Sequence, residues 1–407
     1  MKVPLRYADE EYELDVPDKN LAGVIEPSKT EPVDLEDAIE KNRLPERFNS
    51  GSLRILIIIN DQYRSTPSHL ILNRILPSLL DRHEVRIIVA TGLHDEPAME
   101  EYEKLIGENF EKMDRKFAWS NSRDYVSFRN VGFWPDGGEV YIHNYYFWAD
   151  DVIIIGSVEP HYFAGFTGGI KSIVPGLSYY RTIEHNHNKA VSVKSQPGVT
   201  EGNPVWEELW KTLDLIDEKR IFSYQLVQDS ERNIIGLFSG SIRESYFRAV
   251  KFCQDIYFKN TPQKCDLLVA EHSPPLDRNL YQLQKCFENT KSGVKDGGTL
   301  LMLSGCRDGI GTRDFYDLAE KFPDPNDLLN QEIKRCDLGI HKLYRTAILT
   351  NRVNLCLMSF LQEEAVRRIY IEPVADANEL VRSRVAADGN LKILVVKDAG
   401  HTVINTE

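Results

Sequence analysis

Short apolar runs alternate with amphipathic stretches along most of this chain, and that alternation constrains its fold more than any other feature. The strands expected from these runs lie at residues 53–59, 84–90, 152–155, 266–270, 299–303 and 392–396. Helical stretches follow several of them, at residues 97–106, 280–290 and 315–322. The helix after the first run is expected to have Thr66 as N-cap and Pro67 as its first residue. Strands that alternate with helices predict an α/β fold with mostly parallel sheets.

The alternation breaks at an irregular stretch around Thr261 and Pro262 and then resumes. With 407 residues, the chain is long enough for about two or three domains. We therefore expect two α/β lobes, an N-terminal domain at residues 1–262 and a C-terminal domain at residues 263–407. Such lobes form a cleft between them, and ligands of open α/β sheets bind outside the carboxyl ends of the strands. In the first lobe, residues 3–16 are expected to form two short strands and residues 35–41 a short helix.

Charge and composition exclude several classes of partner. The chain has 49 Lys and Arg against 62 Asp and Glu, a formal net charge of −13, and no basic run to attract a phosphate backbone or an anionic membrane. Its longest apolar runs are about five residues, far below the roughly 18 of a spanning helix. The first residues lack the basic start and apolar stretch of a signal peptide, so we expect a cytoplasmic protein. Six scattered cysteines without a C-x-x-C pair predict buried reduced thiols rather than disulfides or zinc sites.

Polar side chains come directly after three of the apolar runs, where the strands of a parallel sheet would end at one edge. They are Asp61 and Arg64 after the first run, Gly92 and His94 after the second, and Glu159 and His161 after the third. Each residue alone has an ordinary structural explanation, because loops are polar and a single histidine is more often structural than catalytic. Their shared position favours a functional site that contains imidazoles, carboxylates and a cation.

The segment at residues 161–176 is the most unusual in the chain, with the sequence HYFAGFTGGIKSIVPG. Its glycines would permit close approach of the backbone to a ligand, and Lys171 could serve as a phosphate cation or as a nucleophile. The spacing of Gly165, Lys171 and Ser172 matches a phosphate-binding P-loop, but Ile170 replaces the glycine that lets such a loop curl around a phosphate. A nucleotide-binding enzyme is therefore an alternative that this replacement disfavours.

His185 and His187 follow this segment, and on a strand they would face opposite sides, so that at most one would serve a given site. No H-x-x-x-H spacing or carboxylate cluster predicts a metal site built from protein ligands alone.

Tyr281, Gln282 and Lys285 lie at the start of the helix expected at residues 280–290. Gln282 and Lys285 are three residues apart and would share a helix face, where an amide and an ammonium could together bind a carboxylate. A solvated helix surface is the ordinary alternative for such a pair. A glycine-rich loop at residues 304–311 also follows a predicted strand, but a lone Gly-x-Gly is weak evidence.

These blocks together resemble the nickel-pincer lactate racemase family, over nearly the whole chain. The matching blocks are Asp61-x-x-Arg64, residues 90–94, residues 161–176, Thr182-Ile183, Asn186-His187 and residues 276–285. Separated blocks in the same order are highly specific.

The resemblance implies a cofactor that a search for protein ligands does not reveal. Family members use a nickel-pincer nucleotide, a nickel(II) complex of a pyridinium thioamide-thiocarboxylic acid mononucleotide that is made by separate maturation enzymes. By residue match, it would be attached covalently to Lys171, and His187 would be the protein ligand of nickel. Flat coordination by soft sulfur and one nitrogen suits Ni(II). Asp61, Gln62, Tyr63 and Arg64 would also contact the cofactor.

The resemblance also implies the reaction and the residues that perform it. The reaction would be racemisation or epimerisation of a 2-hydroxy acid by hydride removal to a flat 2-keto acid and hydride return to the other face. His94 and His161 would transfer the hydroxyl proton, because imidazole both accepts and donates protons near neutrality. The substrate carboxylate would be bound by Arg64, with Tyr281, Gln282 and Lys285 completing the substrate site from the second lobe.

The chain departs from the family pattern around the substrate and phosphate ends. It has Tyr63-Arg64-Ser65 where Thr-Arg-Pro is usual, and Ile170 where an arginine precedes the lysine. An aromatic residue of the lactate pocket is missing, with Ile340 or His341 near its place. We therefore expect lactate or a larger or more polar 2-hydroxy acid as substrate. The alternative from another class is a two-lobed carboxylate-binding protein without turnover.

Overall fold

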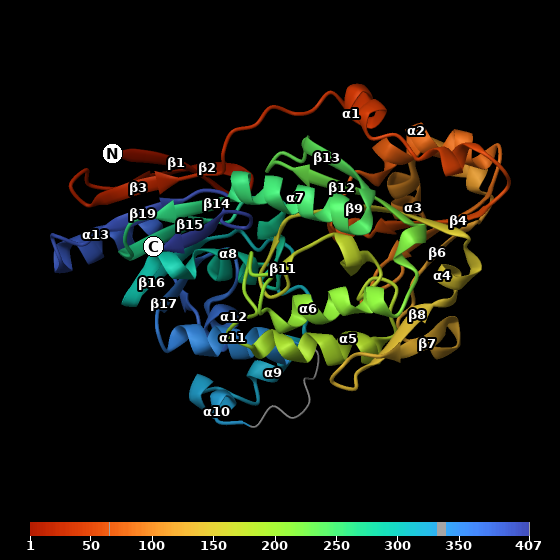
Figure 1. Cartoon of the computed structure of the whole chain (residues 1–407). Helices are drawn as coiled ribbons and strands as arrows, with labels where there is room; N and C mark the ends of the chain where they lie inside the picture. The colour runs from red at the N-terminus through yellow and green to blue at the C-terminus, as the bar shows by residue number, and fades with distance from the viewer. Residues whose placement is uncertain (65, 332–338, 407) are drawn as a thin grey trace.

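The computed structural model of the chain has two α/β lobes that lie side by side (Figure 1). It describes residues 1–64, 66–331 and 339–406, so Ser65 and Cys336 lie outside the described residues. Both termini lie in one lobe, and a long connection runs from there to α1 (Leu35–Lys41), which packs on the other lobe. The predicted α/β class, with two lobes and mostly parallel sheets, is confirmed.

The first lobe is built on a sheet with the strand order β13-β12-β9-β4-β5-β6. Its strands are β4 (Arg54–Asn60), β5 (Glu84–Ala90), β6 (Phe117–Trp119), β9 (Asp151–Ser157), β12 (Ile221–Gln228) and β13 (Ile234–Ser241). Neighbouring strands are parallel except for β12 and β13, which pair antiparallel at one edge. The carboxyl ends of β4, β5 and β9 therefore lie at the same edge of the sheet, as the sequence predicted.

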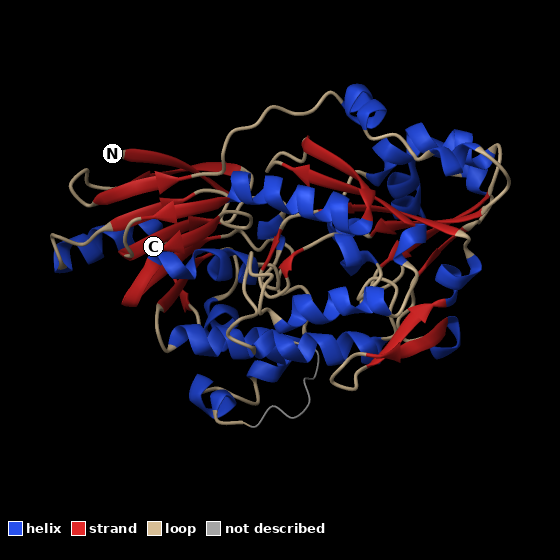
Figure 2. Cartoon of the chain, in the orientation of Figure 1, coloured by secondary structure: helices blue, strands red, loops and turns tan. Residues whose placement is uncertain are grey.

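Side chains of β4 alternate between the two faces of this sheet, because a strand repeats every two residues. Ile55 and Ile57 pack with α2 (Ser68–Leu80) and α3 (Met99–Ile106), whereas Leu56 and Ile58 pack in the core beneath α7 (Ile242–Tyr257). Helices thus cover both faces (Figure 2). Burial on both faces explains why residues 55–59 are apolar without interruption.

The second sheet has the strand order β18-β17-β16-β15-β19-β3, with every neighbouring pair parallel. Its strands are β3 (Leu21–Ile25), β15 (Cys265–Glu271), β16 (Val294–Leu303), β17 (Asn354–Met358), β18 (Glu372–Pro373) and β19 (Ile393–Val396). Strand β3 comes from the N-terminal end of the chain. The hairpin of β1 (Lys2–Tyr7) and β2 (Glu10–Asp15) packs on the same lobe, through Val3, Leu5 and Leu14.

This arrangement differs from the division into residues 1–262 and 263–407. The first 25 or so residues belong to the second lobe, because β3 hydrogen-bonds with β19 across more than 360 positions of sequence. A short strand gives no sequence signal for a partner that far away. Strand β14 (Phe258–Thr261) ends next to the predicted domain boundary at residue 262, and it pairs with β20 (Val403–Thr406) near the end of the chain.

The remaining elements are short and lie around the two sheets. In the first lobe they are β7 (Phe128–Phe133), β8 (Glu139–His143), α4 (Asn144–Trp148), β10 (Pro160–His161), β11 (Gly165–Phe166), α5 (Tyr180–His187) and α6 (Pro204–Lys211). In the second they are α8 (Leu283–Thr290), α9 (Asp314–Ala319), α10 (Pro325–Leu329), α11 (Ile340–Thr350), α12 (Glu363–Arg368) and α13 (Ala377–Ala387).

Two predicted helix starts are wrong. Helix α2 begins at Ser68, and Thr66 is not its N-cap, because the Thr66 hydroxyl hydrogen-bonds with Asn60 Nδ2 and Ser157 Oγ, both at 2.8 Å. Helix α8 begins at Leu283 rather than at residue 280.

Arg345 on α11 joins the two lobes. Its guanidinium forms a double ion pair with Glu288 on α8, with both N···O distances at 2.6 Å. It also donates to the carbonyl oxygens of Ala190 and Ser195 in the first lobe, each at 2.8 Å. Since these groups are almost completely buried, the contact fixes how the second lobe sits over the strand ends of the first.

The prediction of buried, reduced cysteines is confirmed for the part of the chain that the structure describes, where Cys253, Cys265, Cys286, Cys306 and Cys356 are buried free thiols. Among the helices of the described residues, none has the length and apolar character to cross a bilayer.

Candidate active site

Two adjoining cavities lie between the lobes at the carboxyl ends of β4, β5 and β9. The larger has a volume of about 230 Å³ and is lined by residues of both lobes, among them His94, His161, His187, Gln282 and Lys285. The smaller, of about 60 Å³, is lined by residues of the first lobe, including Asp61, Lys171 and Ser172. The two share Arg64, Thr91, Gly92, His94 and Pro175. The predicted interdomain cleft is therefore present, and most of the residues predicted for the site line it.

The turn after β5 places His94 at this cleft. Gly92 has a φ of +58°, and its N–H donates to the carbonyl of Gly176 at 3.2 Å, which ties the turn to the glycine-rich segment. The N–H of His94 then closes a tight turn on the carbonyl of Thr91 at 3.0 Å. A side chain at position 92 would be strained in this left-handed conformation, which explains the glycine.

His94 is held from both sides by residues that follow β4. Its Nδ1 lies 2.5 Å from Asp61 Oδ2, and the Tyr63 ring packs against the imidazole with centroids 4.6 Å apart. Asp61 is buried, whereas His94 and Tyr63 are partly open to the cleft. Gln62 lies in the same short turn, but among the described residues it lines neither cavity, and its Oε1 is buried without a hydrogen-bond partner.

His161 faces the same cavity from β10 in a different environment. The ring is buried, packs on Tyr162 and Phe163, and accepts a weak hydrogen bond at Nδ1 from the N–H of Ala164 at 3.3 Å. Burial, followed by the positive charge of Lys171, lowers the pKa of His161 well below its ordinary value. His161 is therefore a neutral imidazole at physiological pH.

Lys171 comes from a short 3₁₀ turn, Gly169–Ser172. Its ammonium lies 5.6 Å from the centroid of the Phe163 ring. Burial lowers the pKa of Lys171 well below that of a free lysine, and the nearby charges of Arg64 and Lys285 lower it further. A lysine with a lowered pKa is unprotonated, and so nucleophilic, at a lower pH than a free lysine, so the structure favours that reading over a phosphate-binding cation.

The glycines around Lys171 are required by protein packing rather than by approach of a ligand. Gly168 has a φ of +80°, and a Cβ there would lie 2.5 Å from Gln225 Oε1. Gly169 has a φ of +56°, and its Cβ would lie 2.6 Å from the Tyr246 ring. The N–H of Gly169 donates to Gln225 Oε1, and Ile170 is buried in the core. These contacts take up the groups that a P-loop would offer to a phosphate, which argues against the nucleotide-binding alternative.

His187 is the last residue of helix α5, so the histidine pair lies on a helix rather than on a strand. His187 lines the larger cavity and packs against Phe163, whereas His185 bonds with Asp136 at 2.9 Å outside it. Burial, then the charges of Lys171 and Arg64, lower the pKa of His187 to about 3. His187 Nδ1 is buried and has no hydrogen-bond partner among the described residues. A neutral imidazole with an unused nitrogen is suited to bind a metal ion.

The cations of the site come from both lobes and meet at Glu159. Lys285 Nζ lies 3.0 Å from Glu159 Oε1, and Arg64 approaches the same oxygen to 3.8 Å. Burial opposes the ionisation of Glu159, but the charges of Lys285, His401 and Arg64 outweigh it and hold its pKa well below the ordinary value. Gln282 is the N-cap of α8 rather than a residue within it, and it lines the cavity beside Lys285 and Tyr281.

Sequence reasoning placed Ile340 or His341 near the substrate pocket but missed the group of polar side chains on α11 to which His341 belongs. Lys342 lies 3.7 Å from the centroid of the Tyr281 ring, and His341 Nε2 lies 3.1 Å from the Tyr162 hydroxyl. Both line the larger cavity. The signal was present, because His341 and Arg345 are four residues apart on the face of α11 that also buries Leu349. Polar residues on a core-facing stripe indicate buried polar contacts.

One further group of potential metal ligands lies outside the cleft in the described part of the chain, formed by Asp136, His185 and Glu208. The Lys189 ammonium pairs with both carboxylates, so part of the negative charge there is already neutralised by the protein.

Two family models match the chain in tandem. The lactate racemase N-terminal domain matches residues 7–198, and the lactate racemase C-terminal domain matches residues 261–404. Lactate racemase from Thermoanaerobacterium thermosaccharolyticum is 26% identical over 424 aligned positions, covering 99% of each chain. Lactate racemase from Lactiplantibacillus plantarum is 29% identical over 377 positions, covering 89% of this chain and 88% of that protein.

Solved structures share the fold of the whole chain. The lactate racemase apoprotein from T. thermosaccharolyticum has a TM-score of 0.89 at 24% identity and covers 100% of both chains. A crystal structure of a protein from Thermotoga maritima has a TM-score of 0.68 at 15% identity, over 93% of this chain and 100% of that one.

Proposed function

The chain belongs to the lactate racemase family and is an isomerase, and from this premise we propose that it inverts the hydroxyl-bearing carbon of a 2-hydroxy acid by reversible hydride transfer. The observation that supports the proposal best is the arrangement of His94 and His161 in one cavity with Arg64 and Lys285. Two imidazoles can serve the two hydroxyl positions of opposite enantiomers, and two cations can hold one carboxylate between them.

The two histidines divide the proton transfer between them. Asp61 bonds with His94 Nδ1, which directs Nε2 to the substrate and stabilises the imidazolium that forms when His94 takes a proton. His161 is buried and neutral, so it is ready to act as a base. Groups whose surroundings differ in this way provide an acid and a base in one site. One histidine accepts the hydroxyl proton of one enantiomer, and the other, in its protonated form, donates a proton to the keto oxygen as the opposite enantiomer forms. The two histidines exchange these roles in the reverse direction.

The residues around Lys171 fit the cofactor that the family resemblance implies. Lys171 has the lowered pKa of a nucleophilic amine, and His187 Nδ1 and Ser172 Oγ are buried without hydrogen-bond partners among the described residues. We propose that Lys171 carries the nickel-pincer nucleotide and that His187 binds nickel, with Asp61 and Arg64 also in contact with the cofactor. When bound, that group supplies the hydride acceptor. The maturation enzymes and the cytoplasmic location remain predictions from the sequence.

The lining of the cavity favours a substrate more polar than lactate. Arg123, Asp314, His341 and Lys342 line it beyond the two cations that meet at Glu159. His341 is engaged by the Tyr162 hydroxyl near the place where the lactate pocket is expected to have an aromatic side chain. Polar groups there would leave the methyl group of lactate without an apolar contact, whereas a second polar substituent would find hydrogen-bond partners.

The test is to mature the protein with cofactor-synthesis enzymes and follow single-enantiomer 2-hydroxy acids by chiral chromatography. We expect inversion of at least one acid, a covalent adduct on Lys171 by mass spectrometry, and one nickel per chain. Lys171→Ala should lose the adduct, and His187→Ala should lose nickel. His185→Gln is the matched control, because His185 lies two residues away but outside the cavity.

A carboxylate-binding protein without turnover gives a different result. It would bind 2-hydroxy acids equally well in wild type, Lys171→Ala and His187→Ala, and it would invert none of them. An unmodified, nickel-free Lys171 after maturation would rule out the proposed function.

A further inference from the structure

Glu159 occupies a central position in the site that the mechanism does not yet explain. It follows β9, and Thr167 fixes its backbone on both sides, because Glu159 N–H donates to Thr167 Oγ1 and Thr167 N–H donates to the Glu159 carbonyl, both at 2.9 Å. One carboxylate oxygen, Oε1, faces Lys285 and Arg64. The other, Oε2, lies 3.6 Å from His401 Nε2.

His401 is held in place by the turn that follows β19. Its Nδ1 lies 2.9 Å from Asp398 Oδ1, and its N–H donates to the Asp398 carbonyl at 3.0 Å. The Asn289 amide donates to the carbonyls of Ala399 and Gly400, at 3.1 and 2.9 Å. The turn is therefore built to present one buried imidazole to Glu159.

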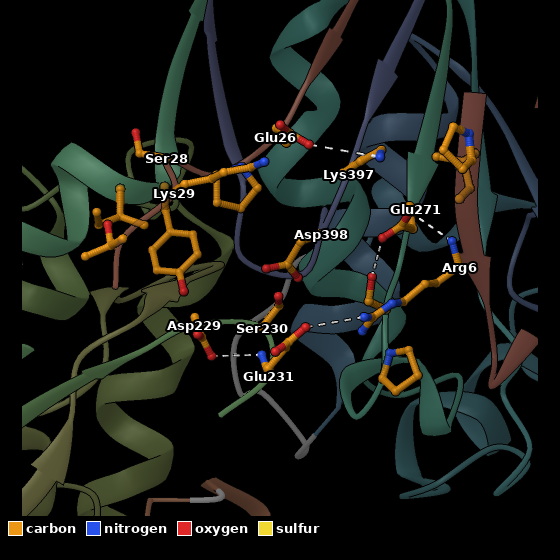
Figure 3. A pocket seen from close by; sticks show the side chains of 18 of the residues that line it. Arg6, Glu26, Ser28, Lys29, Asp229, Ser230, Glu231, Glu271, Lys397 and Asp398 are labelled. Carbon is orange, nitrogen blue, oxygen red and sulfur yellow. Dashed lines mark hydrogen bonds and ion pairs between the residues drawn. The ribbon is translucent and has the colours of Figure 1, made fainter. Parts of the chain in front are cut away.

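Asp398 lies on the wall of a third cavity outside the site, a groove of about 990 Å³ between the N-terminal hairpin and the turn between β12 and β13 (Figure 3). Asp229 and Glu231 line its first-lobe side, and Arg6 and Lys397 its second-lobe side. The Arg6 guanidinium lies 3.6 Å from Glu231 across this groove. Asp398, His401 and Glu159 therefore form a continuous series of contacts from the groove to the substrate cations.

The charge of His401 decides how much positive charge Glu159 leaves for a substrate carboxylate. Burial lowers the pKa of His401, but Asp398 and Glu159 outweigh burial and raise it to about 9, so the imidazole is protonated at neutral pH. Three cations, Arg64, Lys285 and His401, then share the Glu159 carboxylate, whereas Asp398 pairs with the other ring nitrogen of His401. A charged His401 therefore leaves Arg64 and Lys285 more positive charge for the substrate than a neutral one does. The other titratable groups near His401 are Tyr257, whose ring centroid lies 5.5 Å away, and His272, whose own pKa burial lowers to about 3.

We propose that Asp398 and His401 are positioning residues that act through Glu159 on Lys285 and Arg64, and that they set the positive charge with which the site receives the substrate carboxylate. The proposal rests on the proposed function for the identity of the substrate, but its physical content is carboxylate binding. It assigns a role at the active site to two residues that line neither of its cavities.

Asp398→Asn is the decisive variant, because it removes a charge without changing the shape of the turn. Without the Asp398 carboxylate, the pKa of His401 falls, and the imidazole is neutral at a pH where the wild-type imidazole is still charged. We expect the KM for L-lactate, and its Kd from calorimetry, to equal the wild-type values at pH 6 and to rise at least fivefold above them at pH 8.5. The kcat should change less than twofold. A purely structural role would change KM by the same factor at every pH, and that result would overturn the proposal.

Two further variants complete the experiment. His401→Gln should raise KM at both pH values, because its side chain is never charged. Asp229→Asn is the matched control, since Asp229 lines the same groove but caps its own turn by accepting from Glu231 and Asn233 N–H groups, both at 2.9 Å. Its KM should follow the wild type at both pH values.

The two proposals fail in different ways. Binding of L-lactate with the expected pH dependence, but without inversion of any 2-hydroxy acid tested, would support the charge series and contradict the proposed function. Inversion by the wild type, with an effect of Asp398→Asn on KM that does not depend on pH, would support the proposed function and contradict the charge series. Absence of both binding and inversion would contradict both.

Discussion

His94 and His161 have the same side chain but different partners, and the partner of His94 can be removed selectively. Asp61 fixes the His94 ring through Nδ1 at 2.5 Å. In Asp61→Asn, an amide replaces the carboxylate, so the ring loses its orientation and the imidazolium loses a counter-charge. A general acid or base contributes roughly 100- to 10,000-fold, so kcat should fall about 10- to 100-fold, with KM changed less than threefold. Initial rates from both enantiomers measure this, and an unchanged kcat would contradict the role of Asp61.

Lys171 should be recognisable in the apoprotein as a nucleophilic amine. Burial lowers its pKa first, and the charges of Arg64 and Lys285 lower it further. The amine is therefore unprotonated in a larger fraction of molecules at pH 7 than an exposed lysine. Reductive methylation with limiting formaldehyde, followed by peptide mapping, should show a smaller rise in Lys171 modification between pH 7 and pH 9 than an exposed lysine shows. Exposed Lys211 is the control, and its modification should rise steeply over that range. The same steep rise for Lys171 would show that its ammonium is not perturbed.

At the scale of elements, the short turn that carries Lys171 depends on glycines that accept a left-handed backbone in close packing. Gly168→Ala would be strained at a φ of +80° and would place its Cβ 2.5 Å from Gln225 Oε1 and 2.8 Å from Val158. Gly51→Ala is the matched control, with a φ of +73° but no atom within 4 Å of the added Cβ. Backbone strain alone should cost about 1 kcal/mol, and strain with overpacking about 2–4 kcal/mol. Urea unfolding measures the difference, and equal losses in the two variants would mean that the turn relaxes freely.

Elements buried on both faces were predicted almost to the residue, whereas helix starts that depend on distant contacts were not. The run at residues 84–90 coincides with β5, because its buried side chains, Val85, Ile87, Ile88 and Val89, reach the core on both faces of the sheet. Helix α8 starts late because the preceding residues pair with the loop after β16. Leu280 N–H donates to the Gly309 carbonyl and Tyr281 N–H to the Ile310 carbonyl, at 3.0 and 3.1 Å. No local pattern indicates those partners.

At the scale of the whole molecule, the strand-end rule predicted the first-lobe half of the site better than the second-lobe half. Asp61, Arg64, His94 and His161 gather because parallel strands place their carboxyl ends at one edge, a property that local sequence reveals. The contacts of His341 with Tyr162 and of His401 with Glu159 depend on how the second lobe docks. Those contacts join residues more than 120 positions apart, and a single sequence does not reveal which distant residues meet.

Docking of the lobes should itself respond to pH through Glu288. Burial opposes ionisation of this carboxyl, but Arg345 and Lys291 outweigh it and lower its pKa to about 2 from an ordinary 4.5. A carboxyl whose folded pKa is depressed stabilises the fold above its unfolded pKa, and that stability is lost as the pH falls toward the folded pKa. Between pH 5 and pH 2, the wild type should therefore lose about 3 kcal/mol more stability than Glu288→Gln.

The tryptophans allow the unfolding of the first lobe to be followed separately, which tests whether Glu288 holds the two lobes together. All five, at positions 119, 134, 148, 206 and 210, lie in the first lobe, so their fluorescence reports that lobe, whereas far-ultraviolet circular dichroism reports both. In Glu288→Gln the Arg345 guanidinium is buried without its counter-charge, and breaking a buried pair in this way costs about 3–5 kcal/mol. At pH 7 the two urea transitions should coincide in the wild type and separate in the variant, because the lobes no longer unfold together. Asp37→Asn, which removes an exposed ion pair with Lys41, should leave them coincident. Coincident transitions in Glu288→Gln would show that other contacts hold the lobes together.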